Sequence, residues 1–338
     1  MSNVLNSYRD GKSSVTFIPK KGEVMDTCAT ISDKYVCCNV QVIKSVSNCP
    51  FDCSYCFLQD YLNDGTTKVI QDIDAIMTEV RLKTESQPNR LFRIGTWELG
   101  DSLALDHQVG QAAKLIEAFT TIPNAILELK TKSDVVDPII NIDHQCKTVV
   151  SWSFNSDYII DTEEHKTASL KRRLNALSKV SQAGYLVGLH FDPMILYPDW
   201  KMGYSDLVDA IFACVHPNQI AWISIGSLRF KPEMKKKMEN NFPGSSITVQ
   251  EMVLGDDGKL RYVKPIRVEM YLHLMACLNR YINADNLVYL CMERWDMWDR
   301  IFNYHPESIA HLDYLFAESL YHRYPQLSLS KPQRDDYQ

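Results

Sequence analysis

The sequence has no apolar run long enough to cross a membrane. A transmembrane helix needs about 20 consecutive apolar residues, and the apolar runs of this 338-residue chain are all shorter. The N-terminal stretch MSNVLNSYRDGKSS is polar and lacks the apolar segment of a signal peptide. We therefore expect a cytoplasmic protein that makes no membrane contact.

Other absences narrow the class of protein further. The chain has no low-complexity tract, short repeat or Gly/Ser-rich linker. Its ten cysteines are too few for a disulfide scaffold, so we expect core residues, metal ligands or catalytic thiols. The net charge of −6 gives no support for a dedicated nucleic-acid binder, which is usually basic. The apolar fraction of 45% is sufficient for a globular core.

The chain alternates short apolar segments with stretches of helical periodicity. Short apolar segments bounded by polar or turn residues are typical of buried parallel strands. Strands that alternate with helices predict a parallel sheet with right-handed crossovers. The expected strands are YVCCNVQVI (35–43), RLFRIGT (90–96), AILELKT (125–131), TVVSWSFN (148–155), LVGLHFD (186–192), IAWISIG (220–226) and NLVYLCM (286–292).

This pattern predicts an α/β fold built on a partial (β/α)6-type barrel. We expect an N-terminal extension over residues 1–34, the barrel over 35–230, and a C-terminal region over 231–338. The C-terminal region interrupts the rhythm of strands and helices, and we expect it to cover the barrel mouth and to add a closing strand and helices. In such barrels the chemistry lies at the carboxyl ends of the strands.

Three cysteines lie within eight residues, in the stretch SNCPFDCSYCFLQ. Cys49, Cys53 and Cys56 are spaced C-x3-C-x2-C in a segment that its proline and polar residues mark as a loop. Buried core cysteines and a zinc site are the alternatives, but structural zinc usually takes a fourth ligand. An iron–sulfur cluster of the [4Fe–4S] type normally takes four thiolates. Three thiolates would leave one iron open to a ligand that is not protein.

The spacing, with Tyr55 before the last cysteine, resembles the cluster motif of the radical S-adenosylmethionine (SAM) superfamily. The resemblance implies that the amino and carboxylate groups of SAM chelate the open iron. It also implies that reduction of the cluster, by a flavodoxin- or ferredoxin-type protein, cleaves SAM to a 5′-deoxyadenosyl radical.

A closer resemblance is to the spore photoproduct lyase family. It covers about residues 45 to 230, and more loosely to 300. That family repairs a thymine-dimer lesion, so the resemblance implies a nucleic-acid substrate. The matching stretches are CPFDCSYCFLQ, LDH (105–107), TK (131–132), SWSFNSDYII (151–160), AGYLVGLHFDP (183–193) and GY (203–204).

The resemblance also implies which residues contact the cofactor. The stretch GTWE after the second strand matches an element that contacts the amino group of SAM; the alternative is a strand-end turn with a solvated glutamate. His190 and Asp192 share one face of a later strand and suggest substrate or cofactor contact, or else a His–Asp hydrogen bond in the core. The expected cofactor-binding residues are Tyr55, Gly95, Thr96, Glu98, Lys132, Ser153, Asn155 and Asp192.

Two positions depart from the family pattern. This chain has Glu98 at the position where the family has its hydrogen-donor cysteine. It has Phe57 at the position of the second of two tyrosines around the last cluster cysteine. Neither side chain can replace the original as a hydrogen-atom donor. Cys291, late in NLVYLCME, is the cysteine expected to reach the catalytic face, with a core cysteine as the alternative. Tyr55, Glu98 and Cys291 are therefore the candidate catalytic residues.

Three functions remain open from the sequence. The first is a radical SAM enzyme that acts on a nucleic-acid lesion, with mild support from the basic stretches HKTASLKRR (165–173) and KPEMKKK (231–237). The second is the same chemistry on a modified nucleoside, a peptide or a small metabolite, which the two departures favour. The third is a non-enzymatic iron–sulfur or zinc protein.

Overall fold

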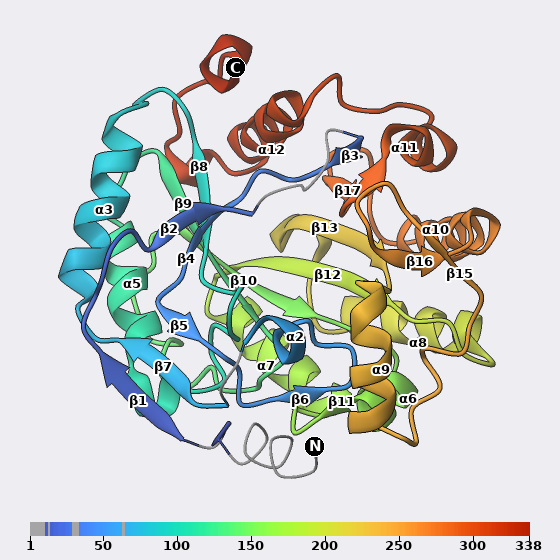
Figure 1. Cartoon of the computed structure of the whole chain (residues 1–338). Coiled ribbons are helices and arrows are strands. Elements are labelled where there is room, and N and C mark those ends of the chain that lie inside the picture. Colours follow the sequence, from blue (N-terminus) through green and yellow to red (C-terminus); the bar gives the residue numbers. More distant parts are fainter. Residues whose placement is uncertain (1–10, 13, 29–33, 63–64) are drawn as a thin grey trace.

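The computed structural model describes residues 11–12, 14–28, 34–62 and 65–338. Its centre is a curved eight-stranded sheet in the order β17-β13-β12-β10-β9-β8-β4-β2 (Figure 1). Every neighbouring pair is parallel except β2 and β4. The strands are β2 (Met25–Thr27), β4 (Gln41–Ile43), β8 (Phe92–Gly95), β9 (Ala125–Thr131), β10 (Thr148–Ser153), β12 (Leu186–Met194), β13 (Ile220–Ser227) and β17 (Val288–Leu290).

Helices lie along the outside of this sheet (Figure 1). Each helix turns apolar residues inward, as the periodicity predicts, and several begin at a capping side chain. Asp72 accepts a hydrogen bond from the backbone of α3, and Ser169 does the same for α7. The outer helices are α3 (Ile73–Glu85), α5 (Gln111–Phe119), α7 (Leu170–Gln182), α8 (Trp200–Phe212), α10 (Lys264–Leu278) and α12 (Ile309–Arg323).

Smaller elements surround the carboxyl ends of the strands. Two short ladders, β6–β11 and β18–β3, and two three-stranded sheets, β1-β7-β5 and β14-β16-β15, complete the pairing of the described strands. Their strands are β1 (Val15–Ile18), β3 (Tyr35–Val36), β5 (Val46–Ser47), β6 (Asp52–Cys53), β7 (Thr67–Ile70), β11 (Glu164–His165), β14 (Arg229–Phe230), β15 (Met252–Leu254), β16 (Leu260–Tyr262) and β18 (Glu293–Arg294). Five further α-helices have bounds within the described residues: α2 (Leu58–Tyr61), α4 (Asp106–Val109), α6 (Asp157–Glu163), α9 (Pro232–Asn241) and α11 (Trp295–Phe302).

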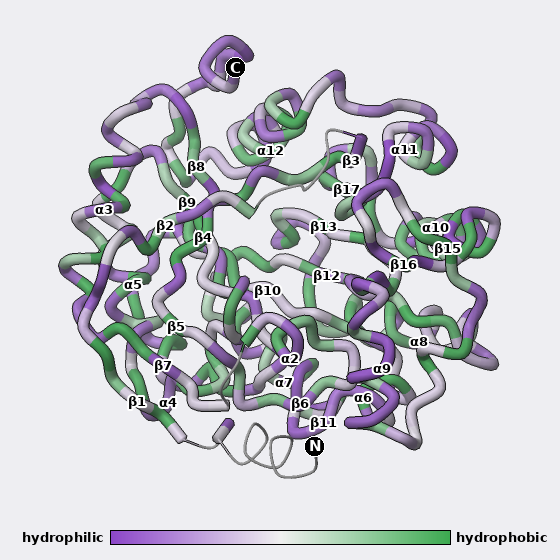
Figure 2. Tube along the Cα trace, viewed as in Figure 1, coloured by the Kyte–Doolittle hydropathy of each residue, from purple (hydrophilic) through white to green (hydrophobic). Residues whose placement is uncertain are grey.

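The core lies between the sheet and the outer helices. The strands β9, β10 and β13 are buried along almost their whole length, and Figure 2 shows apolar residues concentrated there, with hydrophilic residues along α9. In the described ranges no helix combines the length and the apolarity needed to cross a membrane.

The predicted α/β partial barrel is confirmed, with one correction. Residues 35–43 are not a single strand, because Asn39 adopts a left-handed conformation with φ of 54°. The turn separates β3, which pairs with β18, from β4, which joins the main sheet. The division into three regions stays a prediction, and residues 1–10, 13 and 29–33 of the expected N-terminal extension lie outside the described residues.

Candidate active site at the carboxyl ends of the strands

The three predicted cluster cysteines lie on one loop between β5 and α2. Asn48 fixes the start of this loop, since its amide donates to the Gly65 carbonyl at 2.6 Å and its side-chain oxygen accepts from the Cys49 backbone at 2.8 Å. Cys53 lies in β6, which pairs with β11. Burial, followed by the Asp101 carboxylate and the neighbouring thiols, raises the pKa of Cys49 well above its ordinary value. Burial also raises the pKa of Cys53 to about 12, although Lys132 opposes this shift.

The donor set fits an iron–sulfur cluster. All three thiols are free and lie within eight residues of one another, and the backbone N–H of Cys56 donates to the Cys53 carbonyl at 3.1 Å. In the part of the chain that the structure describes, no three His, Cys, Asp or Glu side chains surround one point closely enough to hold a single metal ion. A cluster does not need that arrangement, because each thiolate binds a different iron. The loop can therefore supply the three thiolates.

A buried carboxylate, Glu164, connects the cysteine loop to the barrel. It accepts a hydrogen bond from the Tyr55 hydroxyl, one from Asn155 at 2.9 Å and one from Arg173 at 2.6 Å. The Lys132 ammonium lies 3.9 Å from it and 5.2 Å from the centre of the Tyr55 ring. Burial opposes ionisation, but Arg173 and then Lys132 outweigh it and lower the pKa of Glu164. The sequence prediction missed this residue.

The predicted Lys132, Ser153 and Asn155 are brought together around this carboxylate. Burial opposes the positive charge of Lys132, but Glu164 and then Cys53 outweigh burial and raise the pKa of Lys132. The ammonium therefore stays protonated at neutral pH. Asn155 also accepts from the Tyr204 hydroxyl at 2.7 Å. The Ser153 carbonyl accepts from Arg173 at 2.9 Å. These residues form one continuous network at the ends of β9 and β10.

Arg173 corrects the interpretation of a basic stretch. It belongs to HKTASLKRR, which was considered for phosphate binding, but its side chain is fully buried on Glu164. Its neighbour Arg172 is exposed and pairs with Asp134. Tyr204 is also fully buried. Arg173 and Tyr204 therefore support the network from within.

The GTWE element lies at the end of β8, as predicted. The Trp97 indole lies over Gly95, where a Cβ atom would be only 2.3 Å from the indole nitrogen. Thr96 donates to the Ser102 hydroxyl at 2.8 Å. Glu98 is half-buried, and burial raises its pKa. The structure places Gly95, Thr96 and Glu98 at the predicted edge, and their contacts with a cofactor stay a prediction.

His190 and Asp192 bond to different partners, so the alternative of a His–Asp hydrogen bond in the core is wrong. The His190 ring bonds instead to Glu128 at 2.8 Å, and burial lowers the pKa of His190, so the ring is neutral at neutral pH. Glu128 also accepts hydrogen bonds from Trp97 at 3.0 Å and from Ser151 at 2.7 Å. A glutamate inside the otherwise apolar stretch AILEL was the available sequence signal for this carboxylate.

Asp192 binds Arg229, and both lie beside Cys291. The two guanidinium nitrogens reach the two carboxylate oxygens at 2.9 and 3.2 Å, and one of them lies 3.3 Å from the Cys291 sulfur. Gly226 makes room, since a Cβ atom there would be 2.7 Å from the carboxylate. Burial opposes the shift, but Arg229 lowers the pKa of Asp192 to about 2. Cys291 thus lies at the predicted catalytic edge, next to an ion pair that the sequence did not predict.

This ion pair gives a pH prediction. Because the pKa of Asp192 is depressed from 3.8 to about 2, its ionised form contributes roughly 2 kcal/mol of stability above pH 5. That contribution falls as the pH falls, and about half of it is gone at pH 3. We expect Asp192→Asn to be less stable than the unsubstituted chain at pH 6, with a smaller difference at pH 3, in urea unfolding.

The control for this prediction is Asp209→Asn, because Asp209 pairs with Arg280 on the surface. A surface pair contributes about 1 kcal/mol or less, so the stability difference should change little with pH. An Asp192→Asn difference that stays constant from pH 6 to pH 3 would contradict the assignment.

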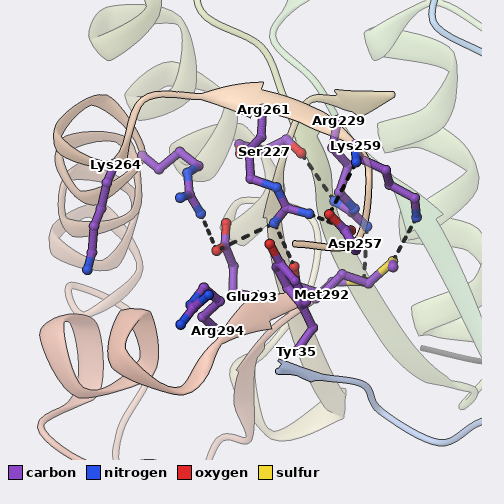
Figure 3. Close-up of polar contacts among 12 residues, drawn as sticks. Tyr35, Ser227, Arg229, Asp257, Lys259, Arg261, Lys264, Met292, Glu293 and Arg294 are labelled. Carbon is purple, nitrogen blue, oxygen red and sulfur yellow. Dashed lines mark hydrogen bonds and ion pairs between the residues drawn. The ribbon is translucent and has the colours of Figure 1, made fainter. Parts of the chain in front are cut away.

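A second polar cluster covers the sheet beyond β13 and β17 (Figure 3). Arg261 on β16 pairs with Asp257 at 2.6 Å, donates to the Met292 carbonyl at 3.2 Å and stacks over Tyr35 at 4.4 Å. Glu293 is bound by Arg267 and by the Tyr271 hydroxyl. These contacts join the segment 252–262 to the strand end that carries Cys291.

Comparison with known proteins identifies the family. The family model described as spore photoproduct lyase matches residues 3–291. The chain belongs to the spore photoproduct lyase family. The family consists of radical SAM enzymes, so the enzyme class expected from the cysteine motif is confirmed and the non-enzymatic alternative is wrong.

The matches to known relatives extend over most of the length of each relative. The chain is 24% identical to the spore photoproduct lyase of Bacillus subtilis (strain 168) over 252 residues, which are 74% of this chain and 72% of that protein. It is 23% identical to that of Clostridium acetobutylicum over 291 residues, 84% of both chains. A spore photoproduct lyase double mutant solved with bound AdoMet and dinucleoside spore photoproduct has the same fold, with a TM-score of 0.75, 23% identity, and coverage of 85% of this chain and 84% of that one.

Proposed function

We propose that this member of the spore photoproduct lyase family binds a [4Fe–4S] cluster through Cys49, Cys53 and Cys56 and cleaves SAM reductively. The observation that carries the proposal is the cysteine loop, with three free thiols joined through β6 and Tyr55 to the Glu164 network. When bound, the cluster supplies the electron that converts SAM to a 5′-deoxyadenosyl radical. The neighbouring side chains have the polarity needed to hold SAM.

The residues around Glu164 can position the cofactor. Lys132 carries a protonated ammonium next to the buried carboxylate of Glu164. This ammonium can donate hydrogen bonds to a carboxylate or hydroxyl group of SAM. Asn155 and Tyr55 are fixed by hydrogen bonds to the same carboxylate, so their positions are set before any ligand arrives. Across the sheet, Gly95, Thr96 and Glu98 are proposed to face the amino group of SAM, and Asp192 completes the proposed set. A rigid network of this kind lowers the cost of ordering upon binding.

We propose a thymine-dimer lesion of the spore photoproduct type as the substrate. Support comes from the family and from its relatives, one of which has been solved in complex with dinucleoside spore photoproduct. A different radical SAM substrate is the second candidate, favoured by two side chains. Glu98 replaces the usual donor cysteine, and Phe57 replaces a tyrosine and is 48% exposed.

Cys291 is the proposed hydrogen donor in place of the missing cysteine. Burial and then Asp192 raise the pKa of Cys291 well above its ordinary value, so the sulfur keeps its hydrogen at neutral pH. A hydrogen-atom donor needs an S–H bond. In the proposed step this bond breaks, a C–H bond forms on the product radical, and a thiyl radical remains on Cys291. One electron from the protein reductant and one proton would return it to the thiol, with one SAM consumed per turnover.

Replacing Cys291 with alanine tests this role. We expect the formation of repaired thymines to fall about tenfold or more while 5′-deoxyadenosine formation continues, because alanine has no S–H bond to give, and even a positioned proton donor contributes about 10²-fold or more. The measurement follows both products by mass spectrometry with a dinucleotide spore photoproduct. Cys146→Ala is the control, since Cys146 precedes β10 at the other end of the barrel. An unchanged yield of thymines in Cys291→Ala would overturn the role.

The deciding experiment uses the full chain, reconstituted anaerobically with iron and sulfide. We expect about four irons per chain and SAM-dependent release of 5′-deoxyadenosine. With deuterated dinucleotide spore photoproduct, deuterium should enter 5′-deoxyadenosine and thymines should be released. Cofactor cleavage without release of thymines would favour the second candidate. Colourless protein that holds one zinc ion would overturn both candidate functions, since each requires an iron–sulfur cluster.

A further inference from the structure

The surface above the last cluster cysteine carries exposed aromatic side chains. Phe57 follows Cys56 directly and is 48% exposed, and Tyr61, one turn later, is 60% exposed. Their rings pack edge to face with centroids 6.3 Å apart. Tyr55, two residues earlier, is directed to the buried Glu164 instead. The chain therefore passes from the interior to the surface within three residues, and a cluster held by Cys56 would lie close beneath this surface.

A lysine-rich helix lies beside these aromatic residues. The helix α9 is next to α2 (Figure 1), and two side-chain contacts join them: Lys237 to Asp60 at 2.5 Å and Asn241 to Gln59 at 2.8 Å. Helix α9 and its N-cap carry four lysines against two glutamates, although the whole chain has a net charge of −6. Lys231 and Lys236 are exposed, and no ion pair among the described residues includes them.

We infer that this surface, formed by Phe57 and Tyr61 with the lysines of α9, is the docking site for the protein that reduces the cluster. The inference rests on the proposed function, because it requires a cluster at Cys56. Its occupant is a small acidic carrier of the flavodoxin or ferredoxin class. Exposed aromatics beside basic side chains suit a transient interface with an acidic partner. An electron that enters here would be one residue from Cys56 along the chain, because Phe57 follows that cysteine directly.

The test compares two reductants on the reconstituted full chain. Reduced flavodoxin needs a docking site, whereas photoreduced deazariboflavin, a small uncharged molecule, does not. We expect Lys236→Glu to slow flavodoxin-driven formation of 5′-deoxyadenosine about tenfold at low salt, because rim charges mainly alter association rates. We expect Tyr61→Ser to slow it about tenfold as well, because it removes an exposed aromatic contact. The difference for Lys236→Glu should shrink in 1 M salt, where the Debye length is about 3 Å. Deazariboflavin-driven formation should be unchanged in both variants.

Two controls make the result specific. Lys83→Glu changes the charge of an exposed lysine on α3 in the same way, away from the cysteine loop, and should behave like the unsubstituted chain. Lys236→Arg keeps the charge and should retain the flavodoxin rate.

The outcomes separate the docking site from the function. Equal flavodoxin rates in Lys236→Glu and Lys83→Glu would overturn the docking site, as would equal losses with both reductants. If Lys236→Glu weakened binding to a single-stranded oligonucleotide and left the flavodoxin rate intact, the surface would be a nucleic-acid site and the inference would also fail. An unsubstituted chain that forms no 5′-deoxyadenosine with deazariboflavin would instead contradict the proposed function.

Discussion

Replacing Cys53 with alanine is expected to remove the cluster and to lower 5′-deoxyadenosine formation by more than about 100-fold. Loss of a residue that only supports a metal ligand already lowers affinity or activity 10- to 100-fold, so loss of a ligand should do more. Cys53 also has no substitute nearby on its strand, since its only neighbour in β6 is Asp52. Iron and sulfide per chain, measured after anaerobic reconstitution, give a readout independent of activity.

The matched control is Cys214→Ala. Cys214 lies just past the end of α8, where its backbone donates to Ile211, and it has no part in the cysteine loop. We expect this variant to keep its iron and its activity. If Cys53→Ala retained about four irons per chain and still cleaved SAM, the proposed ligand set would be wrong.

Much of the fold follows from local patterns. The strands β9, β12 and β13 are mostly apolar segments in the sequence and begin at the predicted residues, because a strand buried on both faces carries apolar side chains at most positions. The break at Asn39 could not be predicted this way. YVCCNVQVI is mostly apolar, with Asn39 and Gln41 as its polar residues. The pairing of β3 with the distant β18, which no local pattern shows, accounts for the left-handed turn at Asn39.

Local patterns likewise predict only part of the candidate site. The cysteine motif, Lys132 and Asn155 were found because spacing and resemblance mark them. Glu164 and Glu128 were missed, since each acquires part of its role from partners far along the chain: Tyr55 lies 109 residues before Glu164, and Trp222 lies 94 residues after Glu128. Burial of a charged group is stable only with such partners, and no local pattern shows where they come from.

The second large effect is expected from Glu164→Gln. This substitution keeps the shape of the side chain but removes the charge that Arg173 and Lys132 share. The Arg173–Glu164 pair is completely buried, and breaking a buried pair costs about 3–5 kcal/mol. We expect the free energy of unfolding of the cluster-free chain to fall by that amount in urea denaturation under reducing conditions.

The adjacent residues provide the control. Arg172 pairs with Asp134 at nearly the same distance, 2.7 Å against 2.6 Å, but Arg172 is largely exposed. Asp134→Asn should therefore lower the free energy of unfolding by less than about 1 kcal/mol. Equal effects of Glu164→Gln and Asp134→Asn would show that the buried network does not stabilise the chain.

Binding of SAM then separates a stabilising role of Glu164 from a positioning role. If Glu164 only stabilises the fold, SAM affinity of the reconstituted Glu164→Gln protein should be normal at temperatures where it remains folded. If Glu164 also holds Lys132 and Tyr55 in place, affinity should fall about tenfold or more even in the folded protein, because each immobilised side chain adds about 0.5–1.5 kcal/mol to the cost of binding. We expect the second result, since Tyr55, Lys132 and Asn155 all take their positions from this one carboxylate.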